Sequence, residues 1–207
     1  MRSARGSLRL RTRIGGRVYP FFKRLFDFFG ALFLLILLSP ILLIVAIAIP
    51  LESPGSPIFT QLRMGRGIKP FTIYKFRSMR KDAPSSGPVL TQVGDPRITR
   101  LGKFIRRTSL DELPQLFNIL KGDMSFIGPR PEVPSIVASD WSEDDKRLVL
   151  SVLPGLSGWA QIHGRDDLDI PTKLRFDREY AEKRSFLLDL QILFRTPLLL
   201  LTGRGIK

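Results

Sequence analysis

A run of 22 residues without a charged side chain, Phe28 to Ile49, constrains this chain more than any other feature. At about 1.5 Å per residue a straight helix of that length would be about 33 Å long, enough to cross a bilayer core of about 30 Å. Ser39-Pro40 lies in the middle of the run, and proline kinks or breaks a helix because it lacks the backbone N–H. Each half alone is too short to span a bilayer.

Both flanks of the apolar run are basic. Eight Lys and Arg residues and no acidic residue precede Leu25, and seven more stand against only Glu52 between the run and Asp82. Cytoplasmic segments carry the excess of positive charge, so a helix that spans the membrane would place one of these flanks on the wrong side. We therefore expect a re-entrant hairpin, helix–break–helix, that enters and leaves through the cytoplasmic face.

Two other interpretations of the apolar run stay open at this point. The first is a single transmembrane helix. The second is a secretory signal peptide, since Ala46-Ile47-Ala48 resembles a cleavage site; the run is longer than the usual apolar region, and cleavage would export the basic middle of the chain.

Composition limits the chemistry. The chain has no cysteine and a single histidine, His163, so thiolate and multi-histidine metal sites are excluded and any metal must be held by oxygen. Oxygen ligands favour magnesium, manganese or calcium. The net charge of +14 favours an anionic partner, either lipid or nucleic acid, but no recognised nucleic-acid-binding motif is present, so we expect no nucleic acid partner.

The remainder of the chain predicts an α+β, mainly helical protein. We expect three parts: a basic arm (1–24), a re-entrant membrane helix (25–52), and a small cytoplasmic α/β catalytic domain (53–207) with interfacial C-terminal helices. Apolar alternation and turn residues predict strands over Ile58–Arg63 and Phe71–Phe76, a surface loop over Asp82–Gly94, an irregular loop over Leu153–Gly158, and helices over Leu101–Arg107, Pro114–Leu120, Trp141–Leu150, Pro171–Arg184 and Phe186–Leu201.

Two adjacent carboxylates, Asp111 and Glu112, lie between a basic helix and an apolar one. One interpretation is a capping box in which Ser109 and Glu112 satisfy the first turn of a helix. Pro114 argues against it, because proline fits poorly at the fifth helical position. The other is functional: an ionised carboxylate in basic surroundings can act as a nucleophile or hold a divalent metal.

Basic residues around the dyad are candidates for phosphate binding. Lys75 and Arg77 should share one face of an extended segment, which suits the grip of a diphosphate, although charges also protect edge strands. Other arginines lie at helix ends or in Gly/Pro-rich loops from which a side chain can reach a site: Arg97, Arg106, Arg107, Arg130 and Arg165.

Several strings occur in a specific order along the chain. They are Lys75-Phe76-Arg77-Ser78-Met79, Asp95-Pro96-Arg97-Ile98-Thr99, Ser109 to Gln115, Gly122 to Pro131, and Gly164-Arg165. In this combination the chain resembles the bacterial sugar transferases, also called polyprenyl-phosphate hexose-1-phosphate transferases or monotopic phosphoglycosyl transferases. The resemblance runs from about Lys23 to Ile206, and the length is similar to that of the family's minimal catalytic form.

The resemblance implies a function and a site. A member of this family moves a sugar-1-phosphate from a UDP-sugar donor to the acceptor undecaprenyl phosphate and releases UMP. Asp111 would be the nucleophile that forms a covalent phosphosugar intermediate, and Glu112 would help to hold Mg2+. Lys75, Arg77, Arg107, Arg130 and Arg165 would bind phosphate or uridine.

It also implies a setting. The enzyme would lie on the cytoplasmic face of the bacterial inner membrane, in contact with membrane lipid and possible downstream glycosyltransferases. There it would initiate a glycoconjugate pathway such as exopolysaccharide or lipopolysaccharide biosynthesis. The family's re-entrant helix, broken at a Ser-Pro pair, falls on Phe28–Ile49.

The sequence departs from the family at two positions. Leu153 stands where a basic residue is frequent, and His163 replaces a more usual asparagine before Gly164-Arg165. A non-catalytic, basic, membrane-anchored scaffold is the alternative function, in which the dyad only caps a helix.

Overall fold

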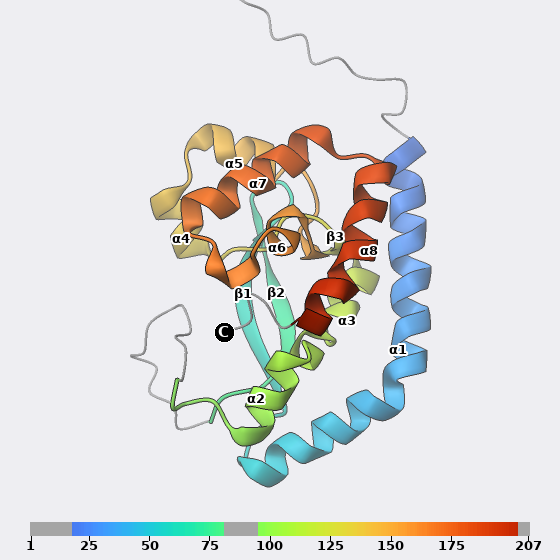
Figure 1. Cartoon of the computed structure of the whole chain (residues 1–207), viewed down its shortest axis with the longest axis vertical. Helices are drawn as coiled ribbons and strands as arrows, with labels where there is room; N and C mark the ends of the chain where they lie inside the picture. The colour runs from blue at the N-terminus through green and yellow to red at the C-terminus, as the bar shows by residue number, and fades with distance from the viewer. Residues whose placement is uncertain (1–17, 81–94, 203–207) are drawn as a thin grey trace, which may run out of the picture.

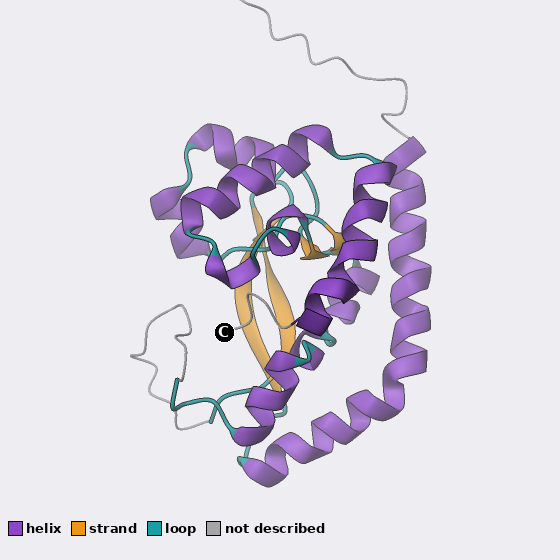
Figure 2. Cartoon of the chain, in the orientation of Figure 1, coloured by secondary structure: helices purple, strands orange, loops and turns teal. Residues whose placement is uncertain are grey.

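A computed structural model describes residues 18–80 and 95–202, and it shows a mainly helical protein around a two-stranded hairpin (Figure 1). Figure 2 distinguishes the helices from the few strands. The elements in chain order are α1 (Val18–Glu52), β1 (Ile58–Gly65), β2 (Lys69–Phe76), α2 (Arg100–Arg107), the 3-10 turn η1 (Leu110–Glu112), α3 (Gln115–Lys121), β3 (Ser125–Ile127), α4 (Pro134–Asp140), α5 (Glu143–Val149), β4 (Gly155–Ser157), α6 (Trp159–Ile162), the 3-10 turn η2 (Arg165–Asp167), α7 (Ile170–Lys183) and α8 (Phe186–Thr202).

Helix α1 is one continuous helix that contains Pro40, and it changes direction about half-way along its length (Figure 1). The expected helix–break–helix is therefore a bent helix instead. Pro40 has no N–H to donate to the carbonyl of Ile36, and the Ser39 hydroxyl donates to that same carbonyl at 2.7 Å. The serine thus supplies the hydrogen bond that the proline removes, which keeps the helix continuous where lipid could not satisfy the carbonyl.

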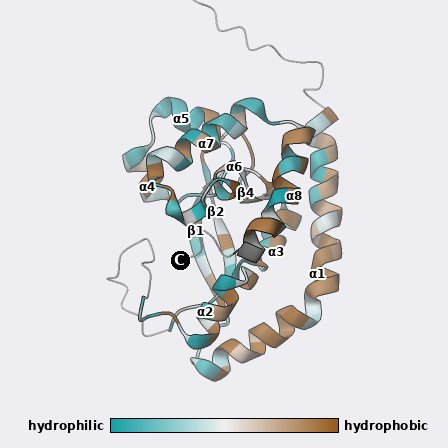
Figure 3. Cartoon of the chain, in the orientation of Figure 1, coloured by the Kyte–Doolittle hydropathy of each residue, from teal (hydrophilic) through white to brown (hydrophobic). Residues whose placement is uncertain are grey.

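Most of the apolar surface of α1 is unburied. It is the one helix, in the described part of the chain, that is long and apolar enough to cross a membrane, and little of its most apolar window is buried. Figure 3 shows apolar residues along most of α1, whereas polar residues cover much of α5. Phe33, Ile36 and Ile44 are each more than 60% exposed. A surface of this kind favours a lipid environment, so α1 is compatible with membrane association.

The N-terminal half of α1 is fastened to the rest of the protein by buried polar contacts. The fully buried Asp27 carboxylate accepts hydrogen bonds from the Phe126 N–H at 2.9 Å and from the Ser125 hydroxyl at 3.1 Å, both in β3. The Arg24 guanidinium donates to the carbonyls of Ile119 and Leu120 at the end of α3. These contacts fix α1 against β3 and α3, because they pair a backbone N–H of β3 and two carbonyls at the end of α3, where helix carbonyls lack a full set of intrahelical donors.

A second buried network joins the start of α1 to α7 and α8. The Asp189 carboxylate of α8 accepts hydrogen bonds from the Tyr19 hydroxyl, the Lys23 ammonium and the Tyr180 hydroxyl, each at 2.7 Å. The start of α1 therefore meets α7 and α8, which lie far from it in the sequence, at one carboxylate, and this explains why α8 lies beside α1 in Figure 1.

Strands β1 and β2 form an antiparallel hairpin, and α3 packs against β2. The fully buried Asn118 of α3 accepts from the Tyr74 N–H at 3.1 Å and donates to the Thr72 carbonyl at 2.7 Å. One amide side chain thereby extends the hydrogen bonding of β2 to the helix, and it sets the position of η1, which directly precedes α3.

Strands β3 and β4 are short and pair in parallel. Their junction requires glycine, because a Cβ on Gly155 would lie 2.1 Å from the Gly128 nitrogen and a Cβ on Gly158 would lie 2.1 Å from the Gly128 oxygen. The sequence predicted an irregular loop over Leu153–Gly158, and this was wrong for Gly155–Ser157. The reason is that the pairing depends on a close backbone approach between distant segments, which a local pattern does not reveal.

The other expected elements are found with shifts at their ends. The hairpin and α2, α3, α7 and α8 fall within the expected ranges to within a few residues, and Gly122 ends α3 in a left-handed conformation with φ of 92°. The helix expected from Trp141 is shorter, because Ser142 forms a capping box with Asp145 and starts α5 at Glu143. The expected loop over Asp82–Gly94 lies outside the described residues, as do residues 1–17 of the expected basic arm.

Asp27 gives a test of how α1 is fastened. Asp27→Leu leaves the Phe126 N–H and the Ser125 hydroxyl without an acceptor, and each buried unpaired group costs about 1–3 kcal/mol. We expect a clear fall in the thermal unfolding midpoint of the detergent-purified protein. Asp27→Asn is the matched control, since it keeps one carbonyl oxygen as an acceptor. Equal midpoints for the two variants would contradict the assignment.

Candidate active site

The carboxylate dyad lies on η1, the short 3-10 turn between α2 and α3. Ser109, which precedes η1, has a left-handed backbone with φ of 57° and makes no side-chain capping bond, and α3 begins after Pro114. The capping-box interpretation of Ser109 and Glu112 is therefore wrong. The proline prevents a regular helix from starting at Ser109, so both carboxylates are free for other contacts.

Glu112 is buried between two cations. Its side-chain Oε1 accepts a hydrogen bond from the Lys75 ammonium of β2 and another from the Arg130 guanidinium, each at 3.0 Å, and the residue is only 8% exposed. Burial by itself would raise the pKa of this carboxyl, but the charges and hydrogen bonds of Arg130 and Lys75 outweigh it and hold the pKa well below its usual range. Glu112 is therefore a fixed anion.

Asp111 behaves in the opposite way. Burial, and then the negative charge of Glu112, raise the pKa of Asp111 to about 6, against the lowering effect of Lys75, Arg106 and Arg130. The dyad thus consists of one carboxylate held by ion pairs and one that is less stabilised as an anion. Two neighbouring carboxyl groups with pKa values pushed apart are typical of catalytic sites in which the groups have different roles.

The dyad is compatible with magnesium bound together with a ligand's phosphates. No group of three or more His, Cys, Asp or Glu side chains that could hold a metal occurs among residues 18–80 and 95–202. Magnesium, however, is commonly bound by one or two carboxylates and completed by substrate phosphates and water. The hydrogen bonds from Lys75 and Arg130 both end on Oε1 of Glu112, so its second oxygen and the Asp111 carboxylate are the ligands that fit such an ion.

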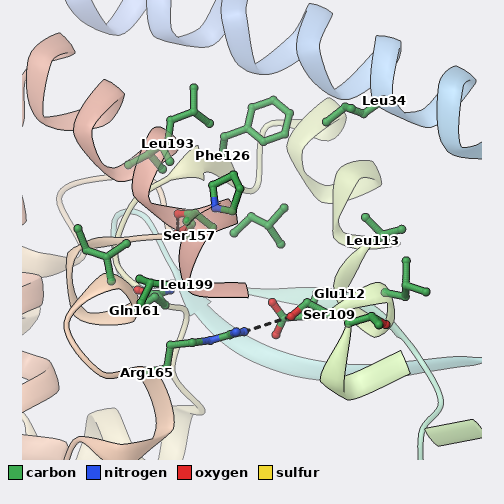
Figure 4. Close-up of a pocket in the computed structure, with 17 residues that line it drawn as sticks. Leu34, Ser109, Glu112, Leu113, Phe126, Ser157, Gln161, Arg165, Leu193 and Leu199 are labelled. Atoms are coloured by element: carbon green, nitrogen blue, oxygen red, sulfur yellow. Dashed lines mark hydrogen bonds between the residues drawn. The ribbon is translucent and has the colours of Figure 1, made fainter. Parts of the chain in front are cut away.

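Backbone strain marks a second part of the site. Ser109 and Arg165 have φ of 57° and 50°, and positive φ is uncommon for residues other than glycine. The two residues also meet, because an Arg165 guanidinium nitrogen lies 3.4 Å from the Ser109 hydroxyl oxygen, as the dashed line in Figure 4 shows. Strain of this kind costs free energy and persists where the surroundings hold it, often at functional sites.

Three of the arginines that the sequence suggested for phosphate binding lie elsewhere. The Arg77 guanidinium donates to the carbonyls of Ser53 and Pro54 after the end of α1, so its role here is to hold the turn between α1 and β1. Arg107 is exposed at the end of α2 and has no described contact with the dyad. Arg97 is paired with Asp95. Of the predicted residues, Asp111, Glu112, Lys75, Arg130 and Arg165 come together.

Of the two neighbouring arginines that the sequence offered as candidates, Arg106 and not Arg107 acts on the charge of Asp111. Two residues near the site, Arg63 and Gln161, were not singled out by the sequence. Arg63 is half-buried near Arg130 and Glu112, and the partial loss of hydration lowers its pKa to about 10. Gln161 of α6 is 7% exposed beside Arg165. The sequence signal that could have identified Gln161 is its place as an uncharged polar residue within an apolar segment just before Gly164-Arg165.

A cavity of about 260 Å3 opens beside Glu112. In Figure 4 Glu112, Ser109 and Arg165 lie at one end, and Leu34, Phe126 and Leu193 lie toward α1 at the other. The wall between them is mostly apolar. Its full lining is Leu34, Thr108, Ser109, Leu110, Glu112, Leu113, Phe126, Ile127, Leu156, Ser157, Gln161, Ile162, Arg165, Leu193, Thr196, Pro197 and Leu199.

The family model described as bacterial sugar transferase matches residues 18–203, which include every part of this site. The chain belongs to the bacterial sugar transferase family. A UDP-N-acetylgalactosamine-undecaprenyl-phosphate N-acetylgalactosaminephosphotransferase of Aeromonas hydrophila is 44% identical over 194 residues, 92% of this chain and 46% of that protein. A UDP-glucose:undecaprenyl-phosphate glucose-1-phosphate transferase of Escherichia coli (strain K12) is 42% identical over 84% of this chain and 39% of that protein.

A shorter relative matches nearly end to end. The exopolysaccharide production protein PSS of Rhizobium leguminosarum bv. phaseoli is 42% identical over 88% of this chain and 97% of that protein. The chain therefore spans less than half the length of the Aeromonas and Escherichia relatives but almost all of the Rhizobium one. The Aeromonas and Escherichia relatives are both named as transferases of a sugar phosphate to undecaprenyl phosphate, and their names give different sugars.

The pKa difference within the dyad can be tested without substrate. Carbodiimides modify protonated carboxyl groups. The modified fraction of Asp111, followed by peptide mass spectrometry, should therefore increase as the pH falls and reach half of its maximum near pH 6. Glu112→Gln should move this midpoint to lower pH, because it removes a neighbouring negative charge that raises the pKa of Asp111. Identical midpoints in the two proteins would refute the coupling.

Proposed function

We propose that this protein is a membrane-associated phosphoglycosyl transferase that moves a sugar-1-phosphate from a UDP-sugar to undecaprenyl phosphate and releases UMP. The observation that carries the proposal is the pair Asp111 and Glu112, in which Glu112 is fixed as an anion by Lys75 and Arg130 and faces an apolar cavity that reaches α1. A polar, charged site and an apolar cavity meet at one carboxylate, as a reaction between a soluble nucleotide sugar and a membrane lipid requires.

The proposed reaction has two steps. An Asp111 carboxylate oxygen attacks the sugar-linked phosphorus of the UDP-sugar, the bond from that phosphorus to the bridging oxygen breaks, and UMP leaves with both electrons. An oxygen of the lipid phosphate then attacks the same phosphorus, the bond to Asp111 breaks, and the carboxylate is restored. The covalent intermediate lets one site serve a soluble donor and a membrane-bound acceptor in turn.

The electrostatics support these roles. Asp111, with a pKa of about 6, is mostly ionised at neutral pH yet is less stabilised as an anion than Glu112, so it is the better nucleophile of the two. Phosphoryl transfer depends mainly on alignment and charge neutralisation, and Lys75, Arg130 and Arg63 supply positive charge beside the dyad. Magnesium held by the dyad and the donor diphosphate would neutralise the charge of the leaving UMP.

The proposed location follows from α1. Basic residues flank the apolar run on both sides, which favours a helix that enters and leaves through the cytoplasmic face of the inner membrane over one that spans it. The bend of α1 supports this, because it turns the second limb away from the direction of the first (Figure 1). The site would then lie at the depth of the lipid phosphates.

The names of the relatives support initiation of a glycan on a lipid carrier, with exopolysaccharide, as for the Rhizobium protein, as one destination. The same lipid-linked sugar phosphate could equally start the synthesis of lipopolysaccharide or another glycoconjugate. Glycosyltransferases that extend this lipid-linked sugar are the partners that such a reaction requires.

The scaffold alternative is disfavoured, since it takes the dyad as a helix cap and Ser109 makes no capping bond. A nucleic-acid-binding protein is disfavoured because α1 exposes a long apolar surface that has no use in such a protein.

The covalent step can be tested by intact mass. After incubation with magnesium and a panel of UDP-sugars, without lipid, the detergent-purified protein should gain the mass of one sugar phosphate with the matching donor. Asp111→Asn should lose the adduct and reduce turnover at least a thousandfold, because it removes the nucleophile while it preserves the shape of the side chain. Removal of magnesium with EDTA should abolish UMP release, and added magnesium should restore it.

The outcomes separate the alternatives. UMP that appears only after undecaprenyl phosphate is added, with no adduct for any donor, would replace the covalent route by direct transfer between donor and lipid. Turnover by Asp111→Asn close to that of the unmodified protein would exclude Asp111 as the nucleophile.

The topology can be tested with single cysteines, because the chain has none of its own. Ala4→Cys and Ser56→Cys lie on the two sides of the apolar run. An impermeant thiol reagent should label both from the cytoplasmic side of membrane vesicles, as expected for a re-entrant helix. Labelling from opposite sides would instead establish a spanning helix.

A further inference from the structure

The cavity beside Glu112 is amphipathic along its length. Its apolar end lies between α1 and α8, where Leu34 and Leu193 line it (Figure 4). Their neighbours in sequence, Phe33, Leu37 and Phe194, are 63%, 58% and 70% exposed. The cavity wall therefore continues into the apolar surface that α1 and α8 leave uncovered.

The polar end carries donors without partners. Gln161 is 7% exposed, and neither its amide nitrogen nor its amide oxygen has a hydrogen-bond partner among the described residues. One terminal nitrogen of Arg165 is likewise buried without a partner there, while the other contacts Ser109. Buried unpaired polar atoms are costly, so a site that retains them next to a cavity is suited to a ligand that pairs with them.

The two cations that hold Glu112 do not belong to this wall. Neither Lys75 nor Arg130 lines the cavity, and Glu112 thus separates a basic region from an apolar one. A nucleotide diphosphate is highly charged and fits the basic region. The cavity, with its mostly apolar wall and its polar end, fits a ligand that is itself apolar with one anionic end.

We propose that this cavity is the acceptor site: it holds the isoprene units closest to the phosphate of the polyprenyl phosphate, and Gln161 and Arg165 donate to that phosphate beside Glu112. This inference rests on the proposed function and assigns its second substrate to named residues. The cavity is large enough only for the start of such a lipid, because about 260 Å3 compares with the roughly 300–1,000 Å3 of whole small-molecule sites. The rest of the chain would run along the exposed surface of α1, past Phe33 and Leu37.

The test compares two variants of α8. Leu193→Trp fills the apolar end of the cavity, and Leu198→Trp is the matched control, since Leu198 lies outside the cavity lining and is 64% exposed. Initial rates are measured as a function of the concentration of undecaprenyl phosphate and, separately, of the UDP-sugar. Formation of the sugar-phosphate adduct is followed by intact mass without lipid.

We expect Leu193→Trp to lower kcat/KM for undecaprenyl phosphate at least tenfold and to leave the rate of adduct formation within twofold. Leu198→Trp should change neither. An unchanged kcat/KM for the lipid in a folded Leu193→Trp protein would overturn the acceptor site, as would an equal loss in adduct formation. Absence of adduct and of UMP in the unmodified protein is the separate result that would refute the proposed function.

Two further measurements keep the proposal testable if Leu193→Trp does not fold. Gln161→Met keeps the size of the side chain and removes its hydrogen bonds, so it should lower kcat/KM for the lipid and spare adduct formation. In the unmodified protein, farnesyl phosphate should compete with undecaprenyl phosphate at least tenfold more strongly than either farnesol or inorganic phosphate. Equal competition by inorganic phosphate would show an anion site alone, and equal competition by farnesol an apolar site alone; each would overturn the proposal.

Discussion

The site depends on one buried carboxylate, Glu112, and on the two cations that neutralise it. A carboxylate at this depth is stable only if opposite charges and hydrogen bonds replace the water that it loses. Lys75 comes from β2, Glu112 from η1 and Arg130 from the segment after β3, so their meeting requires the hairpin, the turn and the β3 segment to be correctly placed together. Asn118 joins α3 to β2 and thereby fixes the turn against the strand.

The same contacts explain why Asp111 differs from its neighbour. Glu112 receives both ion pairs, and Asp111 is left with burial and with the negative charge of Glu112, which raise its pKa to about 6. Two residues of nearly identical chemistry thus acquire different protonation behaviour from their contacts alone. The division of roles between nucleophile and metal-holding anion that we propose rests on this difference.

Helix α1, which is compatible with membrane association, is also part of the site. Asp27 and Arg24 fasten its first half to β3 and α3. Asp189 of α8 accepts hydrogen bonds from Tyr19 and Lys23 at the start of α1 and from Tyr180 of α7, and so joins the three helices. Leu34 of the same helix lines the cavity that ends at Glu112. The helix that favours lipid on its outer surface therefore also forms a wall of the site, so the position of the dyad relative to a membrane is set by packing and not by a flexible linker.

The sequence by itself determined the apolar helix, the hairpin, most of the other helices and the family, because these depend on local periodicity, on proline and glycine, and on ordered motifs. It also indicated the dyad together with Lys75, Arg130 and Arg165. Only the tertiary structure decided that Arg77 holds a turn near Ser53, that Arg106 acts on Asp111 where Arg107 was expected, and that Gln161 lies unpaired beside a cavity. The physical reason is that the partner of a charge or an amide is chosen by three-dimensional contact between distant segments, and side-chain spacing along the chain carries no information about it.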